Sequence, residues 1–108
     1  MKNAIPKSVK ICAHWHSVEV RKTLKHKGEA ATGHIDHSTN KIRLSSRPSR
    51  SILTETLWHE ILHSIAEQMG IGIEEGTVQA LAIGVFQVLC DNPEMRRGAL
   101  YTHGAPDC

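Results

Sequence analysis

Residues 53–70 read L-T-E-T-L-W-H-E-I-L-H-S-I-A-E-Q-M-G. Apolar side chains recur in this stretch at helical spacing and form one wide stripe: Leu53, Leu57, Trp58, Ile61, Leu62, Ile65 and Met69. Gly70 is suited to end such a helix, and residues 45–49 form a Pro-containing break before it. We therefore predict a helix that starts after Ser49 or Ser51 as N-cap and runs to about Met69.

The same helix carries the pattern H-E-x-x-H as His59-Glu60-Ile61-Leu62-His63. Histidines at i and i+4 project side by side, and two such imidazoles bind one Zn²⁺ at roughly 2.0–2.1 Å from each nitrogen. Glu60 then reaches a water on the metal and takes its proton as that water attacks a carbonyl. The pattern is typical of zinc hydrolases, so we predict His59 and His63 as metal ligands and Glu60 as the general base.

A catalytic zinc site usually has a third protein ligand, and two carboxylates follow downstream. Glu75 shares a helical face with Val78, Gln79 and Ala82, so we assign it as the third ligand. Glu74 is rotated from it by about 100° and is the alternative. Acidic enrichment in the first turn of a helix, which the helix dipole favours, is a competing explanation for one of the two.

These carboxylates open a second predicted helix, which Asp91-Asn92-Pro93 stops. Its apolar positions recur at helical spacing: Val78, Leu81, Ala82, Val85, Phe86 and Leu89. Ile83 and Val88 add apolar surface on other sides, so we expect this helix to be buried on most sides or to contact a partner. We expect residues 94–108 to form an irregular tail.

The first half of the chain predicts a small antiparallel sheet. Residues 8–20 are rich in Val and Ile and partly alternate, which indicates one strand, whereas the basic residues 21–33 suggest a loop. Residues 33–37 and 42–44 flank a turn-like Ser-Thr-Asn-Lys and indicate a hairpin. We therefore expect an α+β fold, with about three strands packed on two core helices, in one domain with its core over about residues 8–93.

Further residues compete as ligands or as carbonyl-polarising groups: Cys12, His14 and His16 on one strand face, His34 and His37 at the hairpin, and Tyr101 and His103 in the tail. None has a partner at a diagnostic spacing, so we interpret them as ordinary exposed or half-buried residues.

The formal net charge of +2 hides an asymmetry, because residues 1–50 carry a net +8 and residues 51–108 a net −6. The densest basic run is Arg21-Lys22-Thr23-Leu24-Lys25-His26-Lys27. Such a run can meet nucleic-acid phosphates or an acidic protein, although it also serves simply as a solvated surface. No aromatic residues interleave with it to stack on bases.

The chain shows no apolar run of membrane-spanning length and begins without the apolar stretch of a signal peptide. Its three cysteines, Cys12, Cys90 and Cys108, form no C-x-x-C pair, so we expect buried or terminal free thiols. Together these features predict a cytoplasmic location.

Residues 33–93 resemble the small zinc metallopeptidase-like proteins related to the ImmA/IrrE family, especially short forms carried by phages and prophages. The resemblance lies in the hairpin at Gly33-His34-Ile35-Asp36, the metal helix with residues 59–63, the helix that begins at Glu75, and its end at residues 87–93. It implies a minimal gluzincin-like core, in which an extended peptide lies along the edge strand beside the zinc. We expect no appended helix-turn-helix and no extended C-terminal domain of the kind that longer relatives carry.

We therefore expect a zinc-dependent metallopeptidase that acts on a peptide or protein substrate. The rival hypothesis is a non-catalytic phage or prophage accessory or adaptor protein, in which zinc stabilises the fold. A weaker third hypothesis is a nucleic-acid-associated protein that uses the basic first half.

Overall fold

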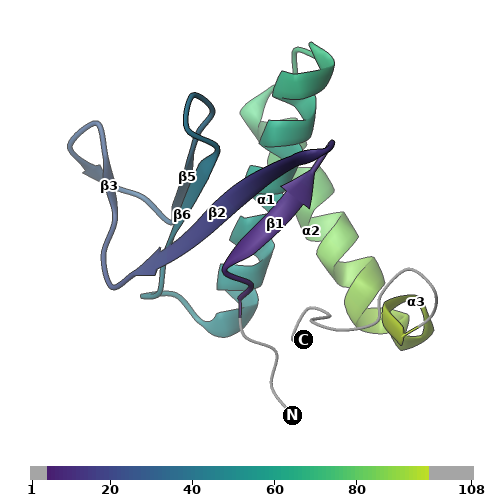
Figure 1. Cartoon of the computed structure of the whole chain (residues 1–108). Coiled ribbons are helices and arrows are strands. Elements are labelled where there is room, and N and C mark those ends of the chain that lie inside the picture. Colours follow the sequence, from purple (N-terminus) through teal and green to yellow (C-terminus); the bar gives the residue numbers. More distant parts are fainter. Residues whose placement is uncertain (1–4, 98–108) are drawn as a thin grey trace.

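The computed structural model describes residues 5–97 and shows a mixed four-stranded sheet on which helix α1 (Arg50–Met69) packs (Figure 1). The strand order is β1 (Ser8–Ile11), β2 (His14–Arg21), β6 (Lys41–Ser45) and β5 (Gly33–Asp36). The expected α+β class is confirmed. The expectation of about three antiparallel strands is wrong, because there are four strands in this sheet and β2 pairs with β6 in parallel.

The additional strand arises because residues 8–20 form a hairpin. Cys12 and Ala13 make its two-residue turn with φ values of 51° and 75°, and β1 pairs antiparallel with β2 around them. Hairpin turns with two positive φ values favour Asn-Gly or Asp-Gly. A Cys-Ala pair therefore carries no turn signal, and the sequence pattern predicts one continuous strand.

The central strand is β6, because its side chains are the most deeply buried of the sheet. Ile42 and Leu44 have no exposed surface. β6 pairs with β2 in parallel, with Val18 opposite Ile42, and with β5 antiparallel, with Ile35 opposite Ile42. A parallel pair needs a long crossover connection, which residues 22–40 supply.

That connection contains a second, two-stranded hairpin of β3 (Lys25–His26) and β4 (Glu29–Ala30). Lys27 and Gly28 at its tip have φ values of 54° and 83°, which a tight two-residue hairpin turn requires. In Figure 1, β3 stands away from the helices. The predicted loop over residues 21–33 is therefore wrong at these strands, and the basic run lies partly on an ordered hairpin.

The predicted hairpin of β5 and β6 is confirmed. Its loop is closed locally, because the Asp36 carboxylate accepts hydrogen bonds from the N–H and the hydroxyl of Ser38 at 3.0 and 2.7 Å. These hydrogen bonds hold the pKa of Asp36 below its ordinary value. The hairpin leaves β5 at the edge of the sheet.

The helix boundaries follow the predicted signals closely. Ser49 is the N-cap of α1, and Gly70 ends it with φ 68°. The N–H groups of Gly70 and Ile71 donate to carbonyls of the last turn, which satisfies groups that the helix end leaves open. The chain then reverses within a short link and enters α2 (Glu75–Asp91).

Beyond α2, Pro93 opens a short helix, α3 (Pro93–Arg97). The expected irregular tail is therefore wrong for residues 94–97. Residues 98–108, with Tyr101, His103 and Cys108, lie outside the described residues.

Helix α1 contacts the sheet and also α2, so it forms the middle layer (Figure 1). The core between α1 and the sheet consists of Ile11, Ile35, Ile42, Leu44, Leu57 and Ile61. The buried stripe of α2 consists of Val78, Ala82, Phe86 and Leu89. Leu81 and Ile83 stay about half exposed, so α2 is buried along one stripe and not on most sides. Met69 is also exposed, against its predicted place in the apolar stripe.

Two further expectations concern the cysteines and the membrane. Cys12 is a free thiol, as expected, but it is exposed and not buried. Cys90 is disulfide-bonded, so the expectation of a free thiol is wrong for Cys90. Within the described residues, no helix combines the length and the apolar character that crossing a bilayer requires.

Because Ile42 is fully buried at the centre of the sheet, Ile42→Ala should lower the free energy of unfolding by about 2–5 kcal/mol. The matched control is Ile83→Ala, since Ile83 is 45% exposed on α2 and its truncation should change stability by less than about 1 kcal/mol. Chemical denaturation of both variants measures this. Equal losses would contradict the assignment of β6 as the core strand.

Candidate metal centre

Two histidines stand side by side in the middle of α1. His59 and His63 are four residues apart, so their side chains leave the same face of the helix. Their ring centroids are 4.8 Å apart, and the two Nε2 atoms approach to 3.1 Å. The helix thus directs both Nε2 atoms to one point.

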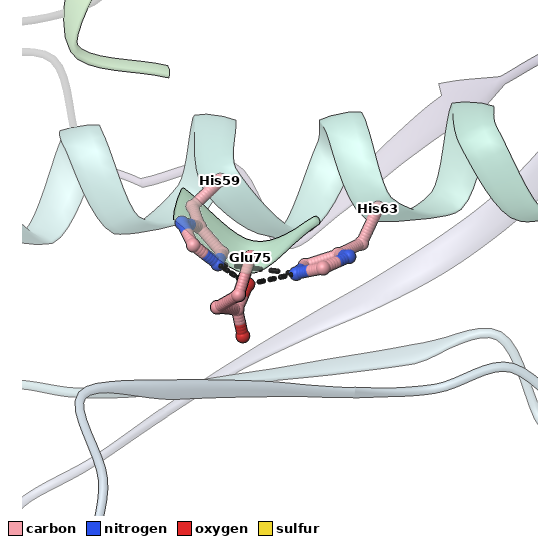
Figure 2. A group of neighbouring side chains, drawn as sticks. All are labelled: His59, His63 and Glu75. Atoms are coloured by element: carbon pink, nitrogen blue, oxygen red, sulfur yellow. Dashed lines mark hydrogen bonds and ion pairs between the residues drawn. The ribbon is translucent and has the colours of Figure 1, made fainter. Parts of the chain in front are cut away.

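Glu75, the first residue of α2, reaches the same point from the second helix (Figure 2). Its Oε1 lies 2.8 Å from His59 Nε2 and 2.6 Å from His63 Nε2. Glu74 is the N-cap of α2 and does not belong to this group. The structure therefore brings together His59, His63 and Glu75, a set whose ligand atoms can hold a metal ion.

The protonation of His59 shows why a cation suits this arrangement. Its Nδ1 lies 2.6 Å from Gln79 Oε1, and the other end of that amide, Nε2, donates to the Glu55 carboxylate at 3.4 Å. The amide oxygen therefore faces the ring, and His59 Nδ1 must carry a hydrogen. In neutral His59 the Nε2 lone pair then points at the Glu75 oxygen, an arrangement that needs either a proton or a metal ion between them.

The distances also fit a tetrahedral ion. Donor atoms at 2.0–2.1 Å from a tetrahedral Zn²⁺ lie about 3.3 Å from each other. The three separations here are 2.6, 2.8 and 3.1 Å, so the ligand atoms need to move apart by about 0.2–0.7 Å. A set of two histidines and one glutamate is moreover a recurrent catalytic zinc donor set.

Partial burial works against the charge of Glu75, but hydrogen bonds with His63 and His59 hold its pKa below the ordinary value. Glu75 is therefore an anion at neutral pH, as a metal ligand must be.

Gln79 is the functional residue that the sequence interpretation missed. It follows Glu75 by four residues, which places both side chains on one face of α2. An outer partner that fixes the tautomer and orientation of a ligating histidine commonly strengthens metal binding. The spacing of four residues between Glu75 and Gln79 could have indicated this role. It does so only when α2 is known to pack beside His59.

Glu60 occupies a different environment from Glu75. It is 5% exposed, and none of the described residues donates a hydrogen bond to its carboxylate. Burial raises the pKa of Glu60 to about 7, although the charges of His59 and His63 lower it. A carboxyl group that exchanges its proton near neutral pH beside a metal centre suits general acid–base chemistry.

Gly33 at the start of β5 makes room for Glu60. A Cβ atom at Gly33 would lie 2.5 Å from Thr56 Cγ2 and 3.0 Å from Glu60 Oε2. Real Cβ atoms do not come this close to a packed methyl group, so only glycine lets the edge strand approach α1 here. The close approach places β5 directly beside the candidate centre.

Two cavities lie beside the place where β5 approaches α1. The larger, about 610 Å³, lies between α1, the start of α2 and the segment Ala30–Gly33, and reaches His59 and Gln79. The smaller, about 220 Å³, lies on the side of His63. Gly33, Glu60 and Glu75 line both cavities, so the candidate centre lies between two open spaces along β5.

The strand with Cys12, His14 and His16 does not gather a metal. Cys12 lies in the turn, His14 is exposed, and His16 is buried. His16 Nδ1–H donates to the carbonyl of His14 at 3.0 Å, and the Ser64 hydroxyl donates to His16 Nε2 at 2.9 Å. Both ring nitrogens are thus occupied, and the contact with Ser64 joins β2 to α1, so His16 is a buried structural residue and not the exposed or half-buried one expected.

His34 and His37 lie at β5, on the wall of the smaller cavity, and not among the three converging ligands.

Comparisons with protein-family models, curated proteins and solved structures give no match for this chain. The geometry of the site therefore carries the functional argument by itself.

Because Gln79 fixes the His59 tautomer, Gln79→Leu should weaken zinc binding by about 10–100-fold while leaving the fold intact. The matched control is Gln87→Leu, since Gln87 lies on the same helix and bonds only to Asp91. Competition with a fluorescent zinc chelator measures both affinities. Unchanged affinity in Gln79→Leu would show that the amide does not orient the histidine.

Proposed function

We propose that this protein is a small zinc-dependent metallopeptidase, with His59, His63 and Glu75 as the zinc ligands. The observation that carries the proposal is the buried carboxyl of Glu60, which has no hydrogen-bond donor among the described residues and lies beside the three converging ligand atoms. A site that only stabilised the fold would not need a buried, unpaired carboxyl group next to it.

When bound, Zn²⁺ supplies Lewis acidity that lowers the pKa of water and polarises a carbonyl. Glu60 is the residue that takes the proton from the attacking water and later delivers it to the leaving amine. Burial favours uptake of a proton by Glu60, and the neighbouring positive charges favour its release. Gln79 holds the His59 ring in the tautomer that leaves Nε2 facing Glu75.

The substrate in this proposal is a peptide in extended form. In the described part of the chain, β5 pairs on one side with β6, and its other side is a sheet edge. An extended peptide can pair with such an edge through main-chain hydrogen bonds. The two cavities on either side of Gly33 would then receive substrate side chains.

The relation to the ImmA/IrrE family, the phage or prophage setting and the cytoplasmic location belong to the same proposal. The H-E-x-x-H pattern with a glutamate on the following helix supports the family relation. The competing function is a non-catalytic accessory or adaptor protein, and the half-exposed apolar residues of α2 favour it, because they offer a surface for a partner protein.

The purified protein should contain about one zinc ion per chain, and removing it with a chelator should lower the melting temperature. The reason is that metal-free His59, His63 and Glu75 hold three polar atoms within 3.1 Å of one another without the ion that balances them. Elemental analysis and thermal melts with and without chelator measure this. A protein that takes up no stoichiometric metal from supplied zinc would contradict the proposed centre.

Glu60→Gln should retain zinc and reduce peptide cleavage by about 10²-fold or more, because the amide keeps the shape but cannot accept the proton. Glu75→Gln should lose zinc affinity, stability and cleavage together, because it replaces a charged ligand. Glu74→Gln is the control, since Glu74 lies outside the ligand group. Zinc content, melting temperature and cleavage of a fluorogenic peptide mixture are measured in parallel.

The three variants separate the two functions. Zinc loss in Glu60→Gln would reverse the roles assigned to the two glutamates. The accessory-protein function would be favoured by a different result. In that case the unmodified protein retains zinc, cleaves no peptide, and does not differ from Glu60→Gln in peptide cleavage.

A further inference from the structure

The larger cavity carries more negative charge than the candidate centre uses. Within residues 5–97, its lining contains three carboxylates, from Glu55, Glu60 and Glu75, and neither a lysine nor an arginine. Glu75 is one of the converging ligands and Glu60 lies beside them, whereas Glu55 stands one turn of α1 before His59. A wall with unbalanced carboxylates favours a ligand that carries positive charge.

The position of Glu55 on α1 does not account for its charge. It lies beyond the first turn of the helix, where the helix dipole would favour an acidic residue. No lysine or arginine stands three or four positions from it, which is the spacing of a helical ion pair. Among the side chains that the structure describes, Glu55 accepts a hydrogen bond from Gln79 at 3.4 Å and forms no ion pair. This half-buried carboxylate therefore lines the cavity with its charge unbalanced by any described side chain.

A second carboxyl group on the same wall shows that the cavity receives a polar ligand. Glu60 is 5% exposed, and none of the described residues donates a hydrogen bond to it. A buried carboxyl group of this kind takes its hydrogen-bond partner from the occupant of the cavity that it lines. A dication at the centre would offset the charges of Glu60 and Glu75, so Glu55 is left to pair with another cation.

The strand geometry brings a substrate side chain to this wall. Ile35 is buried in the core with α1, and a Cβ atom at Gly33 would meet Thr56 and Glu60 on α1, so alternate positions of β5 face that helix. Side chains of a peptide paired with the open edge of β5 alternate in the same way. Every second substrate side chain therefore falls on the face of the sheet where Glu55 lines the cavity.

We propose that the larger cavity recognises a cationic nitrogen group of a peptide bound along β5, with Glu55 as its counter-charge. The nitrogen belongs either to a lysine or arginine side chain or to the peptide N-terminus. The proposal rests on the peptidase function above and names its substrate class as basic peptides. Ala30, Ala31 and Ile52 form an apolar part of the same wall, against which the methylene stem of a lysine or arginine packs.

Two other interpretations of Glu55 are weaker. If Glu55 only held the Gln79 amide, an uncharged oxygen would serve equally, and the separation of 3.4 Å is long for a hydrogen bond. A second metal site would need converging ligand atoms, and within the described residues the set that converges is His59, His63 and Glu75.

The smaller cavity does not offer a comparable site for a cation. Besides the groups at the candidate centre, it is lined by three histidines, two of which, His26 and His34, stack with ring centroids 4.0 Å apart. No carboxylate other than Glu60 and Glu75 stands on its described wall. A cationic group is therefore directed to the side of His59 and not to the side of His63.

The test measures binding, so that it does not depend on cleavage. The full-length Glu60→Gln protein, loaded with zinc, is titrated with acetyl-Ala-Ala-Lys-Ala-Ala-amide and with its Gln counterpart. A second pair compares Ala-Ala-Ala-Ala-Ala-amide with a free and with an acetylated N-terminus, which separates a side-chain from an N-terminal cation. Calorimetry gives the affinities, and backbone amide shifts in two-dimensional NMR give the place. We expect one cationic peptide to bind about tenfold more tightly than its uncharged counterpart, with shifts at Ala31 and Gly33.

Variants show whether Glu55 causes that preference. Glu55→Gln, added to the same protein, should abolish it and leave zinc affinity unchanged, because the new amide oxygen still accepts from Gln79. Glu67→Gln is the matched control, since Glu67 is an exposed acidic residue of α1 outside both cavities, and it should leave the preference unchanged.

Five results would overturn the proposal: no preference in either pair, a preference that survives Glu55→Gln, an equal loss in Glu67→Gln, shifts confined to the smaller cavity, or a joint loss of preference and zinc affinity in Glu55→Gln. Cleavage by the unmodified protein without any charge preference would leave the peptidase function standing while this proposal fails. If the protein takes up no zinc, the same titrations are made on the metal-free protein. A preference that depends on Glu55 would then support the binding site while the peptidase function fails.

Discussion

The packing of the start of α2 against the middle of α1 is the contact on which the candidate centre depends. His59 and His63 are set side by side by the helix alone, but the third ligand comes from a different helix. The reversal at Gly70 and the buried stripe of α2 fix where Glu75 arrives. A shift of α2 by one residue would present either Glu74 or Gly76 in place of Glu75, and with Gly76 the two histidines would lose their carboxylate.

The sheet contributes the other boundary of the site. Because β6 occupies the centre with Ile42 and Leu44, the strand before it is displaced to the edge, where its outer side is open. Gly33 then lets that edge approach Glu60. Glu60 is buried beside the candidate centre, and this burial raises its pKa.

The mismatches between sequence and structure have local causes. Cys12 and Ala13 adopt positive φ values in the turn, which these residue types rarely do. The sequence of this hairpin therefore has the pattern of one continuous strand. The parallel pairing of β2 with β6 depends on which strand buries the most apolar surface. The alternation of residues in a strand does not show which other strand it pairs with. The half-exposed Leu81 follows from α2 packing mainly against α1 along one stripe, and the spacing of apolar residues does not show how many neighbours a helix has.

The sequence by itself determined the α1 helix with its boundaries, the hairpin of β5 and β6, and the residue types of a possible zinc centre, because these follow from spacing within one element. Only the tertiary structure decided that Glu75, and not Glu74, meets the two histidines, and that Gln79 orients His59. It also decided that the basic hairpin carries His26 to His34. These are contacts between elements distant in the chain, and their geometry is set by packing, which no local pattern encodes.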